Sequence, residues 1–237
     1  MASGTLSRIL IKISGEALAG DQSFGVDVML LDRVARQLLD VAKGGRQVAV
    51  VVGGGNIFRG MAVAAGGADR VVADYMGMLG TIINALALAD AINRLGGESW
   101  VTSAVHIPLI ADSFTVRSAR KALDEGKIVI CGGGTGNPFF TTDTAAALKA
   151  VELECDAILK ATKVDGVYSA DPKTNPGALR YDTLTHDDAI TRELKVMDVA
   201  AFAIARDNGL PIIVFSLDAK GGILAVLQGK APSTRVG

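Results

Sequence analysis

The sequence predicts an α/β fold, a three-layer αβα sandwich around a mainly parallel sheet. Short apolar runs alternate with segments of helical periodicity along the chain, which is the pattern of parallel strands joined by crossover helices. The first runs are almost continuously apolar, as expected when helices cover both faces of the sheet. No repeat, linker or shift in composition divides the 237 residues, so we expect one domain, residues 1–237.

Each expected element is bounded by turn or capping residues. The expected strands are Leu6–Ile13, Gln47–Val52, Ser99–Ala104, Lys127–Cys131, Asp156–Lys160 and Ile212–Ser216. The expected helices are Val26–Val41, Tyr75–Leu95, Thr115–Asp124, Ala145–Cys155, Asp187–Leu194, Val196–Asn208 and Gly222–Leu227. The polar segment Asp165–Tyr181 contains two prolines and is expected to form a loop or hairpin.

Tyr75–Leu95 is apolar on almost every side of its expected helix. Such a helix must be buried on several sides, so it is the first candidate for a contact between subunits. Asn84 and Asp90 interrupt the apolar run, and we therefore do not expect a membrane span.

The bulk composition excludes several classes of protein. The net charge of −1 gives no general basic surface for nucleic acid. Cys131 and Cys155 lie in or beside apolar runs and are expected to be buried free thiols, while His106 and His186 are too far apart in sequence to suggest a zinc site. The N-terminus has no cationic region leading into a long apolar stretch, so a cytoplasmic soluble protein is expected.

The chain is organised around the stretch CGGGTGNPFFTTDTAAAL, Cys131–Leu148. A buried strand, a glycine-rich turn and the start of a helix follow one another here. Free backbone N–H groups and the helix dipole favour anionic oxygens at such a place. Asp143 does not fit simple anion binding: it either caps the helix or holds a magnesium ion or a cationic side chain against phosphates.

Glycines and cations gather after the expected strands. These stretches are Lys12–Gly15, Gly53–Asn56, Gly132–Thr142 and Lys160–Lys163. Because ligands of parallel sheets sit beyond the carboxyl ends of the strands, we expect one phosphate-binding edge. The sequence has no Walker A motif and no G-x-G-x-x-G that opens a helix. The pattern favours phosphoryl transfer, which depends on positioning and charge neutralisation.

Individual residues leave alternatives open. Lys12 is placed to bridge the transferred phosphoryl group, or is a solvent-facing lysine at a strand end. Arg59 could reach phosphate or lie on the surface. Asp74 could accept from a ribose hydroxyl or cap the helix Tyr75–Leu95. Phe139 and Phe140 could line an acceptor base or belong to the core.

Six stretches, in order over nearly the whole chain, resemble bacterial uridine monophosphate kinases of the amino-acid kinase superfamily. They are KISGEAL from Lys12, GGGNIFRG from Gly53, DRVVADYMGMLGT from Asp69, GTGNPFFTTDTAA from Gly134, LKATKVDGVYSADP from Leu159 and LKVMDVAAF from Leu194. The resemblance implies a carbamate kinase-like fold and the reaction of ATP with UMP to give ADP and UDP, with Mg2+, in pyrimidine nucleotide synthesis.

The resemblance also implies the site residues. The ATP-binding residues would be Lys12, Ser14, Gly15, Gly55, Arg59, Lys160, Thr162, Tyr168 and Asp171. The UMP-binding residues would be Gly54, Asp74, Thr135, Gly136, Asn137, Pro138, Phe139, Phe140, Thr141 and Thr142. The catalytic residues would be Lys12, Arg59, Asp143 and Asp198, with Asp143 the one possible metal ligand. The UMP side would lie mainly in residues 1–155 and the ATP side in residues 156–237.

Members of this family form homohexamers that GTP activates and UTP inhibits. The segment Gly20–Gly25 corresponds to the part tied to the GTP response, but its residues do not predict activation here. Three other functions compete with a UMP kinase: a nucleotide-binding protein without turnover, a kinase for an amino acid or carbamate, and a Rossmann dehydrogenase. Lys12, Asp143 and Asp198 together argue against a mere binder, and the Gly134–Thr142 loop argues for a nucleotide acceptor.

Overall fold

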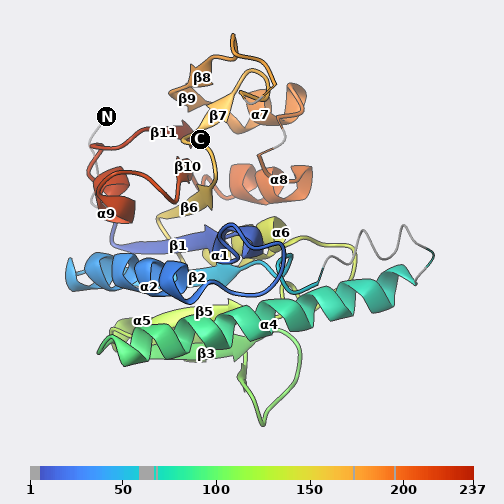
Figure 1. Ribbon diagram of the computed structural model, residues 1–237, viewed down its shortest axis with the longest axis vertical. Coiled ribbons are helices and arrows are strands. Elements are labelled where there is room, and N and C mark those ends of the chain that lie inside the picture. The colour runs from blue at the N-terminus through green and yellow to red at the C-terminus, as the bar shows by residue number, and fades with distance from the viewer. Residues whose placement is uncertain (1–5, 59–66, 68, 173, 195) are drawn as a thin grey trace.

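The computed structural model describes residues 6–58, 67, 69–172, 174–194 and 196–237 (Figure 1). Within these ranges nine strands form one sheet in the order β4-β3-β5-β2-β1-β6-β10-β11-β9. In that order the strands span Asp112–Ser113, Ser99–Ser103, Ile128–Gly132, Gln47–Val52, Arg8–Ile13, Ala157–Thr162, Ile212–Ser216, Ser233–Val236 and Thr183–Leu184. A separate small hairpin pairs β7 (Val167–Tyr168) with β8 (Arg180–Tyr181).

The sheet is parallel except where β11 runs antiparallel to β10. The carboxyl ends of β1, β2, β5 and β6 therefore meet at one edge. β1 and β6 are neighbours, and Lys12 on β1 is the register partner of Lys160 on β6. This register brings together two lysines that lie far apart in the sequence.

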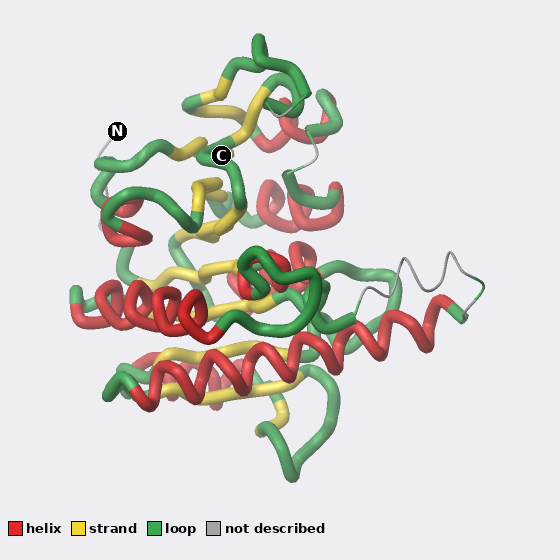
Figure 2. Tube along the Cα trace, in the orientation of Figure 1, coloured by secondary structure: helices red, strands yellow, loops and turns green. Residues whose placement is uncertain are grey.

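Helices cover both faces of the sheet, which confirms the predicted three-layer αβα sandwich (Figure 2). One core cluster lies between the sheet and the helices α2 (Val28–Lys43), α4 (Arg70–Arg94) and α9 (Gly222–Leu227). The other lies between the sheet and α5 (Val116–Asp124), α6 (Thr142–Glu152) and α8 (Val199–Asp207). Two short helices complete the described elements, α1 (Gly15–Leu18) and α7 (His186–Thr191).

Side-chain caps decide where the helices begin, and they correct two of the expected boundaries. Asp69 caps α4 by accepting from the Val72 N–H at 2.9 Å, so the helix starts five residues before the expected Tyr75. Asp74 therefore lies inside α4, and the alternative that it caps the helix is wrong. Thr141 caps α6 in the same way, so Asp143 is not its cap either.

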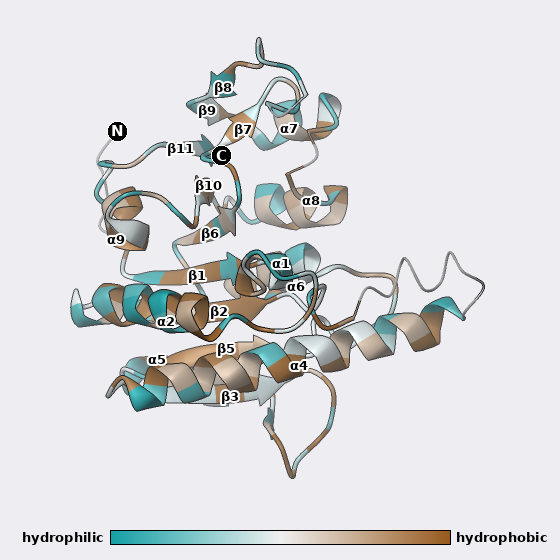
Figure 3. Ribbon diagram, in the orientation of Figure 1, coloured by the Kyte–Doolittle hydropathy of each residue, from teal (hydrophilic) through white to brown (hydrophobic). Residues whose placement is uncertain are grey.

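α4 has one buried and one exposed side. Figure 3 shows apolar residues along much of its length, interrupted by hydrophilic ones. By length and composition α4 could cross a membrane, since an 18-residue window of it has a mean hydropathy of 1.6. However, 44% of that window is buried inside the protein. Its exposed apolar side chains are each 37–56% exposed and recur at successive turns: Val72, Tyr75, Met76, Leu79, Ile83 and Leu86.

The hairpin expected in Asp165–Tyr181 is confirmed, and so are the buried free thiols. Burial raises the pKa of Cys131 and of Cys155 to about 12. The sequence did not predict β4, β9 or β11, because these strands are only two to four residues long and lack a long apolar run.

Candidate active site

The candidate site is a cluster of two lysines and one aspartate at the strand ends, which we name the Lys12–Asp143–Lys160 triad. Lys12 Nζ lies 2.8 Å from Asp143 Oδ1, and Lys160 Nζ lies 2.6 Å from Asp143 Oδ2. Lys160 Nζ also donates to the carbonyl of Val196 before α8. Only 6% of Lys12 is exposed, so the alternative of a solvent-facing lysine is wrong. The aspartate holds a cationic side chain, which was one of its two expected roles.

The electrostatics of the triad follow from burial and from the closeness of the charges. Burial raises the pKa of Asp143, but Lys12 and Lys160 outweigh this effect, so the pKa lies below its ordinary value. Burial, together with the charge of Lys12, lowers the pKa of Lys160 to about 8 despite the opposing pull of Asp143. The triad therefore carries more positive than negative charge at neutral pH, as a site for polyanions requires.

Asp198 fixes the start of α6 rather than touching Lys12. Its carboxylate accepts from the hydroxyls of Thr141 and Thr144, the latter at 2.9 Å. As the N-cap of α8 it also accepts from the Ala201 N–H at 2.7 Å. Asp198 thus joins two helix N-termini, and both helix dipoles point their positive ends toward the triad side of the sheet.

In the first glycine loop, Gly53–Asn56, the first two glycines are packed too closely to carry side chains. A Cβ on Gly15 would lie 2.8 Å from the Gly55 nitrogen, and a Cβ on Gly54 would lie 2.7 Å from the Gly77 carbonyl oxygen of α4. Ser14 caps the short helix α1, accepting from the Ala17 N–H. The predicted ATP contacts at Ser14, Gly15 and Gly55 and the predicted UMP contact at Gly54 therefore lie side by side.

α4 anchors both glycine loops through buried polar side chains. Asn84 donates to the Gly53 carbonyl and to Asn56 Oδ1, each at 2.7 Å. Thr81 Oγ1 accepts from the Gly133 N–H at 2.7 Å, which holds the second loop. Sequence reasoning missed both residues. The polar Asn84 inside an apolar helix was the available signal, because a buried amide needs partners.

The second loop bends tightly before α6. Asn137 N–H donates to Thr135 Oγ1 at 3.2 Å, and Gly136 N–H donates to the Gly133 carbonyl at 2.9 Å. Pro138 follows, and the rings of Phe139 and Phe140 are exposed, so the alternative that they belong to the core is wrong. The predicted UMP residues Thr135 to Thr142 thus form one continuous surface that ends at the first residue of α6.

Asp74 lies beside this second loop. Its Oδ2 accepts from the Phe139 N–H at 2.7 Å, and Arg70 Nε lies within hydrogen-bond distance of both carboxylate oxygens, at 2.9 and 2.8 Å. Burial raises the pKa of Asp74, but these donors outweigh it and the pKa lies below its ordinary value. Asp74 is therefore an ionised acceptor at neutral pH.

Tyr168 and Asp171, predicted for ATP, line one cavity of about 480 Å3 together with Pro172, Leu194 and Val196. The Tyr168 hydroxyl donates to Asp165 at 2.6 Å, which holds the ring in place. Because Val196 also accepts from Lys160, this cavity adjoins the triad. Thr162, at the end of β6, donates a hydrogen bond from its hydroxyl to the Val164 carbonyl and lines a different cavity.

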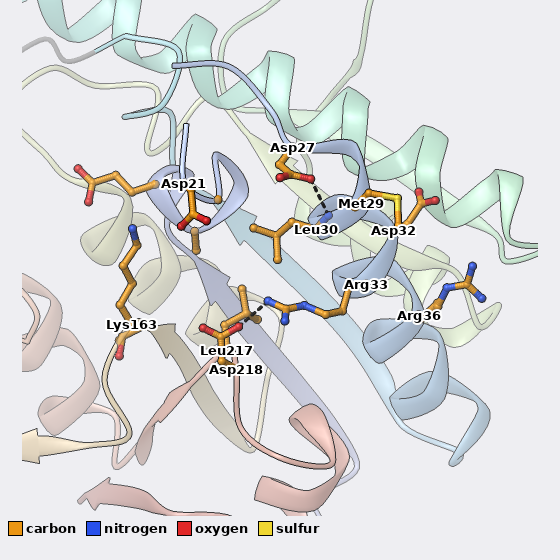
Figure 4. A pocket seen from close by; sticks show the side chains of 14 residues that line it. Asp21, Asp27, Met29, Leu30, Asp32, Arg33, Arg36, Lys163, Leu217 and Asp218 are labelled. Atoms are coloured by element: carbon orange, nitrogen blue, oxygen red, sulfur yellow. Dashed lines mark hydrogen bonds and ion pairs between the residues drawn. The ribbon is translucent and has the colours of Figure 1, made fainter. Parts of the chain in front are cut away.

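That second cavity, of about 910 Å3, lies between the N-terminal part of α2, the segment after α1 and the ends of β6 and β10 (Figure 4). Arg33 and Asp218 face each other across it at 2.5 Å, and Asp27 caps α2 through the Leu30 N–H. The sequence did not predict this cavity. Gly20 and Asp21 line it and belong to the GDQSFG segment, which was the one available signal.

Arg59 lies outside the described residues. Among the residues that the structure describes, no group of three or more His, Cys, Asp or Glu side chains could hold a metal ion, and both Asp143 oxygens already face lysines. A resident metal site does not fit these side chains.

An αβα sandwich with a cation-rich edge, two glycine loops and no P-loop defines a class of phosphotransferase. The model of the amino acid kinase family matches residues 7–216, and the chain belongs to this family. The predicted amino-acid kinase fold is thereby confirmed.

The relatives narrow the class further. A uridylate kinase of Brucella abortus is 56% identical over 97% of this chain and 95% of its own length, and one of Agrobacterium fabrum is 55% identical over the same shares. The UMP kinase structures of Ureaplasma parvum and Bacillus anthracis superpose with TM-scores of 0.92 and 0.93, each at 39% identity. The superposition with the Ureaplasma parvum structure covers 98% of this chain and 99% of that one. The superposition with the Bacillus anthracis structure covers 99% of this chain and 97% of that one. The resemblance to bacterial uridine monophosphate kinases is confirmed over nearly the whole chain.

Proposed function

We propose that this protein is a UMP kinase, which transfers the γ-phosphoryl group of ATP to UMP and serves pyrimidine nucleotide synthesis. The observation that carries the proposal is the buried Lys12–Asp143–Lys160 triad beside two backbone glycine loops. In the reaction the bond from the γ-phosphorus to the β,γ-bridging oxygen breaks, and its electron pair leaves with ADP. A new bond forms between that phosphorus and a phosphate oxygen of UMP.

The protein's task in this reaction is to hold two polyanions in line. Lys12 and Lys160 offset the charge on the transferred group and the leaving oxygen, where charge grows in the transition state. Asp143 fixes both ammonium groups, and Asp198 fixes the start of α6. No general base is required, because the accepting phosphate of UMP is already anionic.

We assign UMP to the side formed mainly by residues 1–155 and ATP to the side formed mainly by residues 156–237. The second glycine loop and Asp74 support the acceptor side, since they present backbone N–H groups, exposed rings and an ionised acceptor. The cavity around Tyr168 and Asp171 supports the donor side, since a ring and a carboxylate suit a base and a ribose. Magnesium would arrive bound to the phosphates of ATP as part of the substrate.

We further propose a homohexamer in the cytoplasm, in which the exposed face of α4 meets a second copy of this chain. Six apolar side chains on successive turns of one helix favour burial against a partner. Ile83→Asp should shift the mass measured by light scattering toward the monomer, and an unchanged mass would contradict this contact. GTP activation and UTP inhibition are expectations from the family, and adding each nucleotide to the assay below tests them.

An ADP-release assay with ATP, Mg2+ and a panel of acceptors tests the proposed function. The panel contains UMP, dUMP, CMP, an acidic amino acid and carbamate. We expect UMP to be the preferred acceptor. ADP release with the amino acid or carbamate but not with UMP would instead support another kinase of the family. Nucleotide binding without ADP release would support a binding protein.

A further inference from the structure

Arg70 is the first residue of α4 and contacts two parts of the proposed acceptor site at once. Its Nε approaches both oxygens of Asp74, at 2.9 and 2.8 Å. Its guanidinium carbon lies 5.3 Å from the centroid of the Phe139 ring. Asp74 in turn accepts from the Phe139 N–H, so the three residues form a closed set of contacts between α4 and the second glycine loop.

Helix electrostatics do not account for Arg70 at this position. A cation in the first turn of a helix opposes the positive end of the dipole, and an arginine placed before its acidic partner is the weaker order of the pair. Arg94 shows the opposite arrangement at the other end of the same helix. It lies in the last turn, follows its partner Asp90 by four residues, and pairs with it at 2.9 Å. Helix stability explains Arg94 but leaves Arg70 to be explained.

Phe139 has a backbone conformation that needs support. Its φ of 72° is in the left-handed region, which is unfavourable for an aromatic residue. The ring is 64% exposed, so core packing does not hold it there. The Asp74 carboxylate holds its N–H and the Arg70 guanidinium lies against its ring.

We propose that Arg70 is a positioning residue for the acceptor nucleotide. It orients the Asp74 carboxylate and the Phe139 ring so that Asp74 Oδ1, which does not accept from Phe139, presents a lone pair to the ribose 2′-hydroxyl. Arg70 thereby selects a ribonucleotide over a deoxyribonucleotide without contacting the reacting phosphates. This inference rests on the proposed function, because it assigns a specificity to that acceptor site.

The contacts set the expected size of the effect. An oriented hydrogen bond to a charged acceptor contributes about tenfold or more to affinity. Arg70→Gln should therefore raise the KM for UMP about tenfold or more, and should reduce the ratio of kcat/KM for UMP over dUMP by a similar factor. The KM for ATP and the kcat at saturating UMP should stay within about twofold of the wild type.

Steady-state kinetics with UMP, dUMP and ATP, together with calorimetric titration of UMP alone, test the proposal on the full-length protein. Arg70→Lys should restore part of the UMP affinity, since it keeps the charge but not the planar donor geometry. Arg94→Gln is the matched control: it should lower the thermal stability and leave all three KM values unchanged. If Arg70 were merely structural, Arg70→Gln would lower Tm and move the KM values for ATP and UMP together.

The results separate the two levels of the proposal. A wild-type protein that neither binds nor phosphorylates UMP would overturn the proposed function and this inference with it. A wild-type protein that phosphorylates UMP, with Arg70→Gln binding UMP equally well and discriminating equally against dUMP, would overturn the role of Arg70 alone.

Discussion

Replacing Lys12 by methionine tests the central feature of the site. Methionine keeps the apolar stem of the side chain and removes its charge, so the packing of β1 changes little. Asp143 keeps its contact with Lys160 at 2.6 Å, and no buried carboxylate is left without a cation. The substitution therefore removes mainly the charge that would face the transferred phosphoryl group.

The expected loss follows from the distances in the triad. Two unit charges about 4 Å apart in an effective dielectric of about 20 interact by about 4 kcal/mol. Asp143 already offsets part of the charge of Lys12 at 2.8 Å, so the net loss is smaller than this value. Loss of one donor to a transition-state oxyanion lowers kcat roughly 100- to 1000-fold, and we expect an effect of this size. KM should change far less, because the contact strengthens in the transition state.

ADP release measured over a range of UMP and ATP concentrations separates kcat from KM. Lys149→Met provides a matched control. Lys149 is also a buried lysine, paired with Glu152 at 2.8 Å, but it lies on α6 near Phe114 and not in the triad. That variant should retain its kcat. If Lys12→Met raised only KM, Lys12 would be a binding residue and the assignment would be wrong.

Three other predictions concern the donor side and the support of the loops. Burial lowers the pKa of Lys160 to about 8, so kcat/KM for ATP should fall as the pH rises through that value and the lysine loses its charge. Lys160→Arg should abolish this fall, and a flat pH profile in the wild type would refute the prediction. Asp171→Asn should weaken ATP binding in a titration with little change for UMP, and an equal loss for both would contradict its place on the donor side. Asn84→Leu should lower the free energy of unfolding in urea by about 2–3 kcal/mol, because the buried Gly53 carbonyl and Asn56 Oδ1 lose the amide that donates to them; an unchanged midpoint would argue against this anchoring role.

The long elements of the fold could be predicted from sequence because their patterns are local. The apolar strands, the caps and the glycine stops each act within a few residues. The start of α4 was misplaced because Asp69 and Asp74 both precede apolar residues, and the sequence offered no reason to prefer Asp69 as the cap. The short edge strands escaped prediction because their pairing depends on neighbours distant in sequence.

In the candidate site, too, the features with a local sequence pattern could be predicted and those that depend on distant segments could not. The glycine loops and Lys12 could be predicted because glycines and a lysine at the end of an apolar strand are a local sequence pattern. The partners of Asp143 and Asp198 could not be predicted, because they depend on how α6 and α8 pack against the sheet. Arg70 had no signal of its own, since the sequence placed it before the expected start of the helix at Tyr75, and its role depends on Phe139 on another segment.

The register of β1 and β6 explains why the triad needs its aspartate. Neighbouring strands lie about 4.8 Å apart, so register partners on one face bring their side chains close together. Lys12 and Lys160 are such partners, and like charges directly opposite each other destabilise a sheet. Asp143, projecting from the first turn of α6, lies between them and offsets that repulsion while the site is empty. In the proposed reaction the oxygens of the triphosphate would take over part of that role, so the same two lysines would be tolerated before binding and available during transfer.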